Sequence, residues 1–164
     1  KKQGDYDVKY LGFNYRMTDF QAALGLYQII RYKKNLKQRH LIAKRYIKNF
    51  KKIKNLTHMP YSKDCSFFIF QIFCKNRDYI LKELKNKKIG VSVHYLNALP
   101  KMSYYKKKYN LNKSSFLNAD NYGLTNISLP IYPKLKLAEV DKICKTIIDL
   151  SESYQSLVRK KVAA

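Results

Sequence analysis

The chain has 164 residues, of which 46% are apolar, and its formal net charge is +23. This length suffices for one domain with a core, and the apolar content argues against disorder despite the charge. The longest apolar run, residues 67–70, is far too short to cross a bilayer, so no membrane span is expected. Three cysteines without a Cys-x-x-Cys pair favour free thiols in a reducing cytoplasm over disulfides or a zinc site.

The net charge admits two interpretations. A strong positive field attracts phosphate, as in proteins that bind nucleic acid or anionic membranes. However, only six of the 34 basic residues are arginine, the side chain that phosphate and base recognition favours for its bidentate geometry. The abundance of Lys, Ile, Asn, Tyr and Phe also fits AT-rich codons. We favour compositional bias and expect no specific nucleic-acid partner. A catalytically inactive basic module for nucleic acid or anionic surfaces is the alternative.

The first predicted element is a helix over residues 18–50, because apolar side chains recur there at helical spacing without a proline. Thr18 and Gln21, three residues apart, fit a capping box at its start, and Asp19 suits its first turn. The later pattern predicts a strand at 66–74, a helix at 77–87 capped by Asn76, a strand at 91–95, short helices within 101–113 and 116–126, a strand at 127–129, and a final helix with an apolar stripe from Val140 to Leu157.

Two polar side chains directly ahead of the first helix are candidates for binding an anion. Asn14 offers an amide and Arg16 a guanidinium, and the helix N-terminus adds its free N–H groups and dipole. Such a set suits a phosphate group. A polar turn ahead of a capped helix is also common for purely structural reasons, so the residues alone leave both interpretations open.

Three motifs carry a resemblance to a known family. Residues 10–25 resemble the GxNYRMTDxQAALG segment of the DegT-type, pyridoxal-phosphate-dependent sugar aminotransferases, which install an amino group on a keto nucleotide-sugar. Residues 90–95 are similar to the family's GIGTxVHY strand, and residues 127–133 to its LSLPLYP turn. The three motifs follow the family's order and cover nearly the whole chain.

The resemblance implies the roles of four residues. Asn14 and Arg16 match the NYR motif, which reaches across a homodimer towards the cofactor phosphate of the neighbouring subunit. His94 and Tyr95 match the HY pair that lines the sugar-nucleotide pocket. The family's Schiff-base lysine, and the carboxylate on the cofactor's pyridine nitrogen, lie upstream of the NYR segment. No residue of this chain is therefore assigned a catalytic role or a metal, and the chain is not expected to transaminate alone.

The resemblance also implies an organisation. The expected fold is an α/β (α+β) small C-terminal domain of a fold-type I aminotransferase, with a long N-terminal helix, a sheet of two or three largely antiparallel strands and flanking helices. Residues 1–17 would be a connection and arm from a large domain, residues 18–50 a linking helix and residues 51–164 the small domain. The implied partners are pyridoxal phosphate, a nucleotide-sugar, an amino-acid donor such as glutamate, and a second copy bound through an arm from Asn14 to Gly25.

Overall fold

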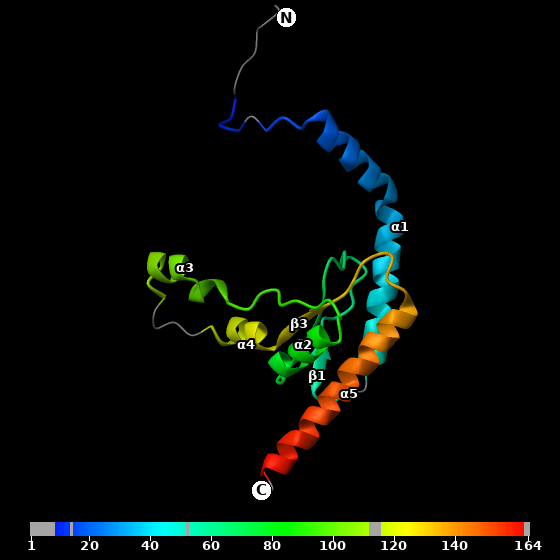
Figure 1. The fold of residues 1–164 in the computed structure, drawn as a ribbon. Coiled ribbons are helices and arrows are strands. Elements are labelled where there is room, and N and C mark those ends of the chain that lie inside the picture. Colours follow the sequence, from blue (N-terminus) through cyan, green and yellow to red (C-terminus); the bar gives the residue numbers. More distant parts are fainter. Residues whose placement is uncertain (1–8, 14, 52, 112–115, 163–164) are drawn as a thin grey trace, which may run out of the picture. The chain divides into compact units, whose positions relative to one another are not determined.

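A computed structural model describes residues 9–13, 15–51, 53–111 and 116–162 (Figure 1). The chain forms two compact units, divided between Lys33 and Lys34. The elements are α1 (Asp19–Phe50), β1 (Leu56–His58), β2 (Phe70–Cys74), α2 (Arg77–Asn86), η1 (Leu99–Lys101), α3 (Ser103–Lys108), α4 (Leu117–Thr125), β3 (Asn126–Leu129) and α5 (Leu137–Val162). None of the helices within these described ranges is long and apolar enough to cross a membrane.

Helix α1 begins at the predicted capping box. The Thr18 N–H donates to Gln21 Oε1 at 3.0 Å, and the Gln21 N–H donates to Thr18 Oγ1 at 3.3 Å. In the first unit the helix leaves large apolar side chains in solvent: Phe20 is 73% exposed and Ile30 70%. Burial within that unit therefore contributes little to this part of the helix, although most helical stability in proteins comes from packing an apolar face.

The second unit is built on a three-stranded sheet in the order β1-β2-β3, with both pairs antiparallel. The expected small antiparallel sheet is thus confirmed. The strand predicted at 66–74 starts only at Phe70, since Phe67 has a positive φ of 46°. The carbonyls of Phe67 and Phe68 instead accept hydrogen bonds from Arg39 Nη1, at 3.0 and 3.4 Å. The strand predicted at 91–95 is reduced to a single bridge between Ser92 and Ser128.

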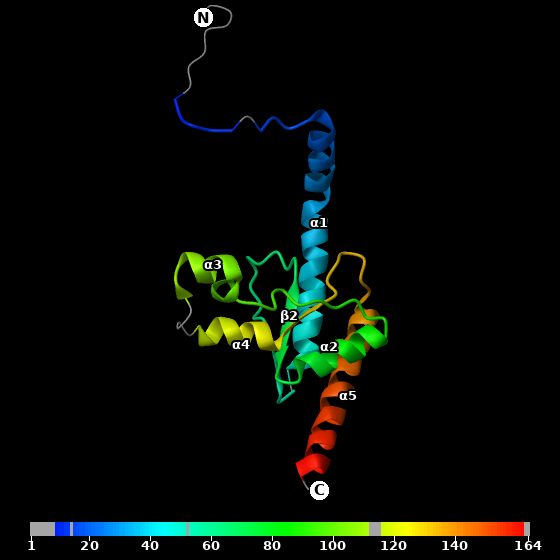
Figure 2. The ribbon, with the colours of Figure 1, turned by 60° about the vertical axis from the view of Figure 1, so that its left-hand side comes forward.

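Helices cover both faces of this sheet (Figures 1 and 2). Residues an odd number apart on a strand point to opposite faces. On one face, Phe70 stacks on Tyr46 of α1 with ring centroids 4.9 Å apart. On the other, Phe73 packs against Tyr122 of α4 at 5.3 Å. The buried apolar core lies on the first face, between β2, α1, α2 and α5.

A bidentate ion pair joins α1 to α5. Arg45 Nε and Nη2 lie 2.6 and 2.5 Å from the Asp141 oxygens, and Asn49 Nδ2 donates to Asp141 Oδ1 at 2.8 Å. The Arg45 and Asn49 hydrogen bonds hold the pKa of Asp141 at about 2, below its ordinary value of 3.8. A carboxyl whose pKa is lowered by folding stabilises the protein above the ordinary value and loses this contribution as the pH falls through the folded pKa.

We therefore predict that Asp141→Asn lowers the free energy of unfolding by about 1 kcal/mol at pH 7, a modest effect because water screens the half-exposed pair. The difference between variant and wild type should shrink between pH 4 and pH 2, the interval bounded by the two pKa values of Asp141. Urea unfolding at several pH values measures it, with the exposed Asp149→Asn on the same helix as control. A deficit that persists unchanged at pH 2 contradicts the assignment.

Candidate functional site

The candidate substrate residues His94 and Tyr95 lie together in the second unit. They belong to the connection between α2 and η1, directly after the Ser92 bridge to β3. Their rings meet edge to face with centroids 5.6 Å apart. His94 is half-buried, whereas Tyr95 is 71% exposed. The pair thus presents one fixed imidazole and one solvent-facing phenol at the surface.

The His94 imidazole is held by two serine hydroxyls. Its Nδ1 lies 2.9 Å from Ser128 Oγ on β3 and 3.2 Å from Ser92 Oγ. A hydroxyl can donate or accept, so these serines accommodate either tautomer of the ring. Both bonds use Nδ1, so neither serine occupies Nε2, the other ring nitrogen.

A buried amide fixes the backbone at this pair. Asn126 is 0% exposed. Its Oδ1 accepts the His94 N–H at 3.1 Å, and its Nδ2 donates to the carbonyls of Tyr122 at 2.7 Å and Tyr95 at 3.4 Å. One side chain therefore connects β3, α4 and the His94–Tyr95 connection.

A second amide, on β2, completes the arrangement. Gln71 Nε2 donates to the His94 carbonyl at 2.8 Å, and the Tyr122 hydroxyl donates to Gln71 Oε1. Gln71 is also buried. Because both amides have partners, they avoid the cost of leaving a buried polar group unsatisfied. We call Gln71, Tyr122 and Asn126 the amide network.

The amide network was not predicted from the sequence. Gln71 interrupts an otherwise apolar strand, and Asn126 directly precedes the apolar residues of β3; these were the available signals. Gly123 lets α4 lie close to the backbone of Leu96, because a Cβ at position 123 would be 2.3 Å from the Leu96 carbonyl oxygen. The partners come from separate segments, so local pattern alone does not reveal them.

The candidate cofactor residues lie in the first unit, and Asn14 falls outside the described residues. Arg16 is exposed, two residues ahead of Thr18. The capping box already uses the N–H groups of Thr18 and Gln21. In the described part of this segment, the Arg16 guanidinium is therefore the main group that can bind an anion. Its planar, forked set of N–H donors fits a phosphate. The donor chemistry is compatible with the phosphate of pyridoxal phosphate.

Three lysines and three tyrosines alternate in blocks over residues 104–109, which include most of α3 and the residue after it. Basic and aromatic side chains together can bind single-stranded nucleic acid. The Lys108 ammonium lies 5.4 Å from the Tyr104 ring centroid and 5.6 Å from that of Tyr109. These rings therefore pack on a cation of the same segment, an attractive arrangement in its own right. This reduces their value as stacking platforms for bases.

Relatives of known or suggested role match most of the chain. The spore coat polysaccharide biosynthesis protein SpsC of Bacillus subtilis is 32% identical over 155 residues, covering 88% of this chain and 39% of SpsC. The UDP-4-amino-4,6-dideoxy-N-acetyl-beta-L-altrosamine transaminase of Campylobacter jejuni serotype O:2 is 30% identical over 162 residues, covering 94% of this chain and 42% of the transaminase. The chain thus spans about two-fifths of the length of these relatives.

Solved structures of aminotransferases also match this chain. Spr1654 from Streptococcus pneumoniae in its PMP form superposes with a TM-score of 0.80 at 28% identity, covering 94% of this chain and 40% of Spr1654. Helicobacter pylori PseC, an aminotransferase involved in the biosynthesis of pseudoaminic acid, gives 0.78 at 26% identity, covering 93% of this chain and 42% of PseC. The family model itself matches residues 1–148. The chain belongs to the DegT/DnrJ/EryC1/StrS aminotransferase family.

Proposed function

We propose that this chain is the C-terminal part of a cytoplasmic, pyridoxal-phosphate-dependent aminotransferase that acts on nucleotide-linked keto sugars in amino-sugar or polysaccharide biosynthesis. The observation that carries the proposal is the family match over residues 1–148, together with relatives named for sugar transamination and polysaccharide biosynthesis. In this proposal, residues 1–17 are an arm from a large domain, residues 18–50 link the domains and residues 51–164 form the small domain.

His94 and Tyr95 are the proposed substrate residues. A nucleotide-sugar presents hydroxyl, carbonyl and phosphate oxygens, which the imidazole Nε2 and the phenol can meet with hydrogen bonds. The amide network and the two serines hold this pair before any ligand arrives. Binding then costs less ordering entropy, which is the physical benefit of preorganisation.

Arg16, with Asn14, is the proposed contact to the cofactor phosphate of a partner subunit. When bound, pyridoxal phosphate supplies an electron sink for the amino-group transfer. The contribution of this chain is to hold the phosphate and orient the sugar. The lysine that binds the cofactor covalently, and the carboxylate on its ring nitrogen, are proposed to lie outside residues 1–164, so this chain alone does not transaminate.

A chimera tests the proposed function. The matched segment of the C. jejuni transaminase is replaced by this chain, and glutamate-dependent transamination of a UDP-linked keto sugar is measured. We expect the chimera to be active. His94→Ala should raise its KM for the sugar about tenfold, because the variant removes a hydrogen-bonded contact worth about 1.4 kcal/mol.

Arg16→Ala should weaken the retention of the cofactor by the chimera. The exposed Lys82→Ala is the control for both variants and should change neither KM nor cofactor retention.

Two outcomes contradict this proposal. One is a chimera that folds, by circular dichroism and gel filtration, and retains cofactor but is inactive with every keto sugar tried. The other concerns the isolated chain mixed with pyridoxal phosphate and borohydride. We expect only scattered labelling of its lysines; a stoichiometric adduct at a single lysine would show that the chain holds its own cofactor lysine.

The proposed homodimer contact is the arm from Asn14 to Gly25. Within the first unit the arm exposes apolar side chains, Met17 at 70%, Phe20 at 73% and Leu24 at 51%. Exposed apolar groups in one segment are typical of interaction surfaces. We predict that Phe20→Glu shifts the chimera from dimer to monomer in sedimentation velocity, while Lys33→Glu on the same helix leaves it dimeric. An unchanged dimer in Phe20→Glu would exclude the arm as the contact.

The amide network gives a further prediction, measurable on the chain itself. Asn126→Ala removes the side-chain partner of the His94 N–H and of the Tyr95 carbonyl, whereas the Tyr122 carbonyl keeps the backbone N–H of residue 126. We expect a loss of about 2 kcal/mol in the free energy of unfolding. The exposed Asn118→Ala on α4 should stay within about 0.5 kcal/mol. If the network also positions His94, its ring resonances shift in Asn126→Ala under conditions where the protein is still folded. Unshifted resonances would leave the network without a positioning role.

A further inference from the structure

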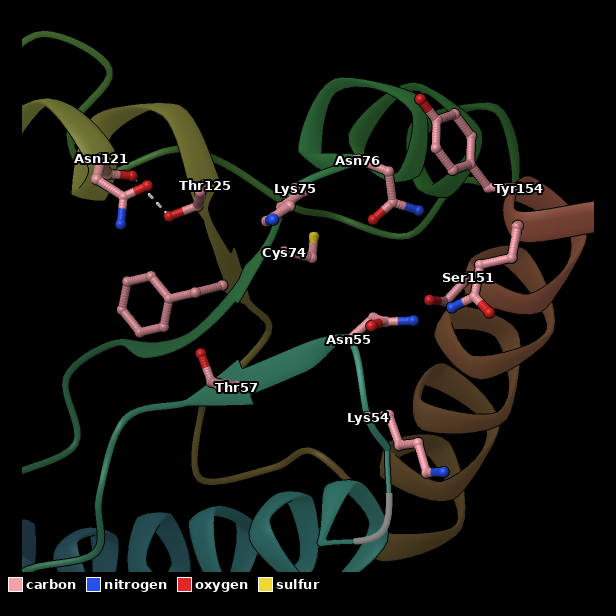
Figure 3. Close-up of a pocket in the computed structure, with 12 residues that line it drawn as sticks. Lys54, Asn55, Thr57, Cys74, Lys75, Asn76, Asn121, Thr125, Ser151 and Tyr154 are labelled. Carbon is pink, nitrogen blue, oxygen red and sulfur yellow. Dashed lines mark hydrogen bonds between the residues drawn. The ribbon is translucent and has the colours of Figure 1, made fainter. Parts of the chain in front are cut away.

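A cavity of about 460 Å³ lies apart from His94 and Tyr95, where β1 and β2 meet α4 and α5 (Figure 3). Phe73 and Thr57, which face each other across β1 and β2, form part of its wall. Thr125 of α4 and Tyr154 of α5 line it from two sides. Its volume falls within the roughly 300–1,000 Å³ of small-molecule sites.

The lining of this cavity is polar, aromatic and cationic. Its twelve described residues comprise four carboxamides, three hydroxyl side chains, two lysines, two aromatic rings and Cys74, and they include no carboxylate. Burial raises the pKa of Cys74 to about 11, although Arg77 opposes this shift, so the thiol is neutral at physiological pH. Lys54 and Lys75 therefore give the cavity a positive formal charge that no lining residue offsets.

Two of its polar groups are placed for a ligand. Asn76 occupies the N-cap of α2, where the sequence predicts a capping side chain, yet it makes no side-chain capping hydrogen bond. This prediction was wrong in its detail, and the Asn76 carboxamide faces the cavity instead (Figure 3). Ser151 is only 3% exposed and lines the same cavity from α5. The cavity thus combines the half-buried Asn76 and the buried Ser151 with lysines, Lys54 and Lys75, that are exposed at its rim.

The two aromatic rings that line the cavity, Phe73 and Tyr154, each pack against a further ring outside it. Phe73 packs against Tyr122 with centroids 5.3 Å apart, and Tyr154 packs against Tyr79 at 5.2 Å. Each ring is therefore oriented by a second ring outside the cavity. Rigid apolar faces beside convergent polar groups are the usual composition of a small-molecule site.

We propose that this cavity binds a phosphorylated monosaccharide. The two lysines supply charge for the phosphate. Carboxamides both donate and accept, as do hydroxyl groups, so they match the hydroxyls of a sugar. The aromatic faces can cover the apolar C–H faces of a sugar ring. A finite cavity lined on several sides suits one sugar better than an extended polyanion, which requires a long basic groove.

Titration of the 164-residue chain with glucose 1-phosphate, followed by heteronuclear NMR in 0.15 M salt, tests this proposal. We expect saturable one-to-one binding at about 1 mM ligand or below, with shifts at Asn55, Asn76 and Ser151. Lys54→Glu/Lys75→Glu should weaken binding at least about tenfold. The matched control, Lys82→Glu/Lys85→Glu, makes the same change in net charge at exposed positions outside the cavity and should retain binding.

Ser151→Ala separates sugar recognition from attraction of a bare anion. It should weaken glucose 1-phosphate several-fold and leave the weaker binding of inorganic phosphate unchanged. No saturable binding, or equal losses in the cavity and control pairs, overturns the proposal and leaves only non-specific attraction to a basic chain. Inorganic phosphate that binds as tightly as glucose 1-phosphate overturns the sugar assignment. Circular dichroism of each variant excludes unfolding as the cause.

Discussion

The constraint on which the second unit depends is that β2 must bury both of its faces while one of them carries an amide. Phe70, Ile72 and Cys74 turn to the apolar core. Gln71 turns to the other side, where an unpaired amide would cost about 1–3 kcal/mol. The structure meets this demand by bringing the Tyr122 hydroxyl and the His94 carbonyl to Gln71. Together with Asn126, which bonds the same two segments, Gln71 thus ties α4 and the His94–Tyr95 connection to the sheet.

The parts of the fold predicted from sequence are those set by local chemistry. The capping box at Thr18 and Gln21 involves residues three apart, and its reciprocal hydrogen bonds are observed. Helix α5 follows from its apolar stripe, whose members Val140, Ile143 and Ile147 are buried. The antiparallel sheet followed from the family resemblance, because hydrophobic alternation within a strand does not reveal the direction of its neighbours.

The wrong predictions depended on distant partners. Residues 66–69 have the composition of a strand. However, Arg39, 28 residues before Phe67, donates a hydrogen bond to the Phe67 carbonyl at 3.0 Å, and the backbone turns at Phe67 with a positive φ. The same limit applies to the candidate site. His94 and Tyr95 could be identified from a motif, whereas Gln71 and Asn126, 55 residues apart, became partners only through the fold. Local propensity cannot encode such pairs, and tertiary contacts override it where they compete.

The proposed sugar site and the His94 site share one face of β2, and this raises the question of whether one influences the other. Gln71 and Phe73 lie two residues apart, so they project to the same side. Tyr122 contacts both, packing on Phe73 and donating to Gln71. Shared contacts of this kind couple ligand binding at the two sites only if the element that connects them, here α4, can adopt two arrangements. Gly123 opposes a second arrangement of α4, because even a Cβ would lie 2.3 Å from the Leu96 carbonyl oxygen. A helix packed this closely has little room to move, so we expect the two sites to bind their ligands independently.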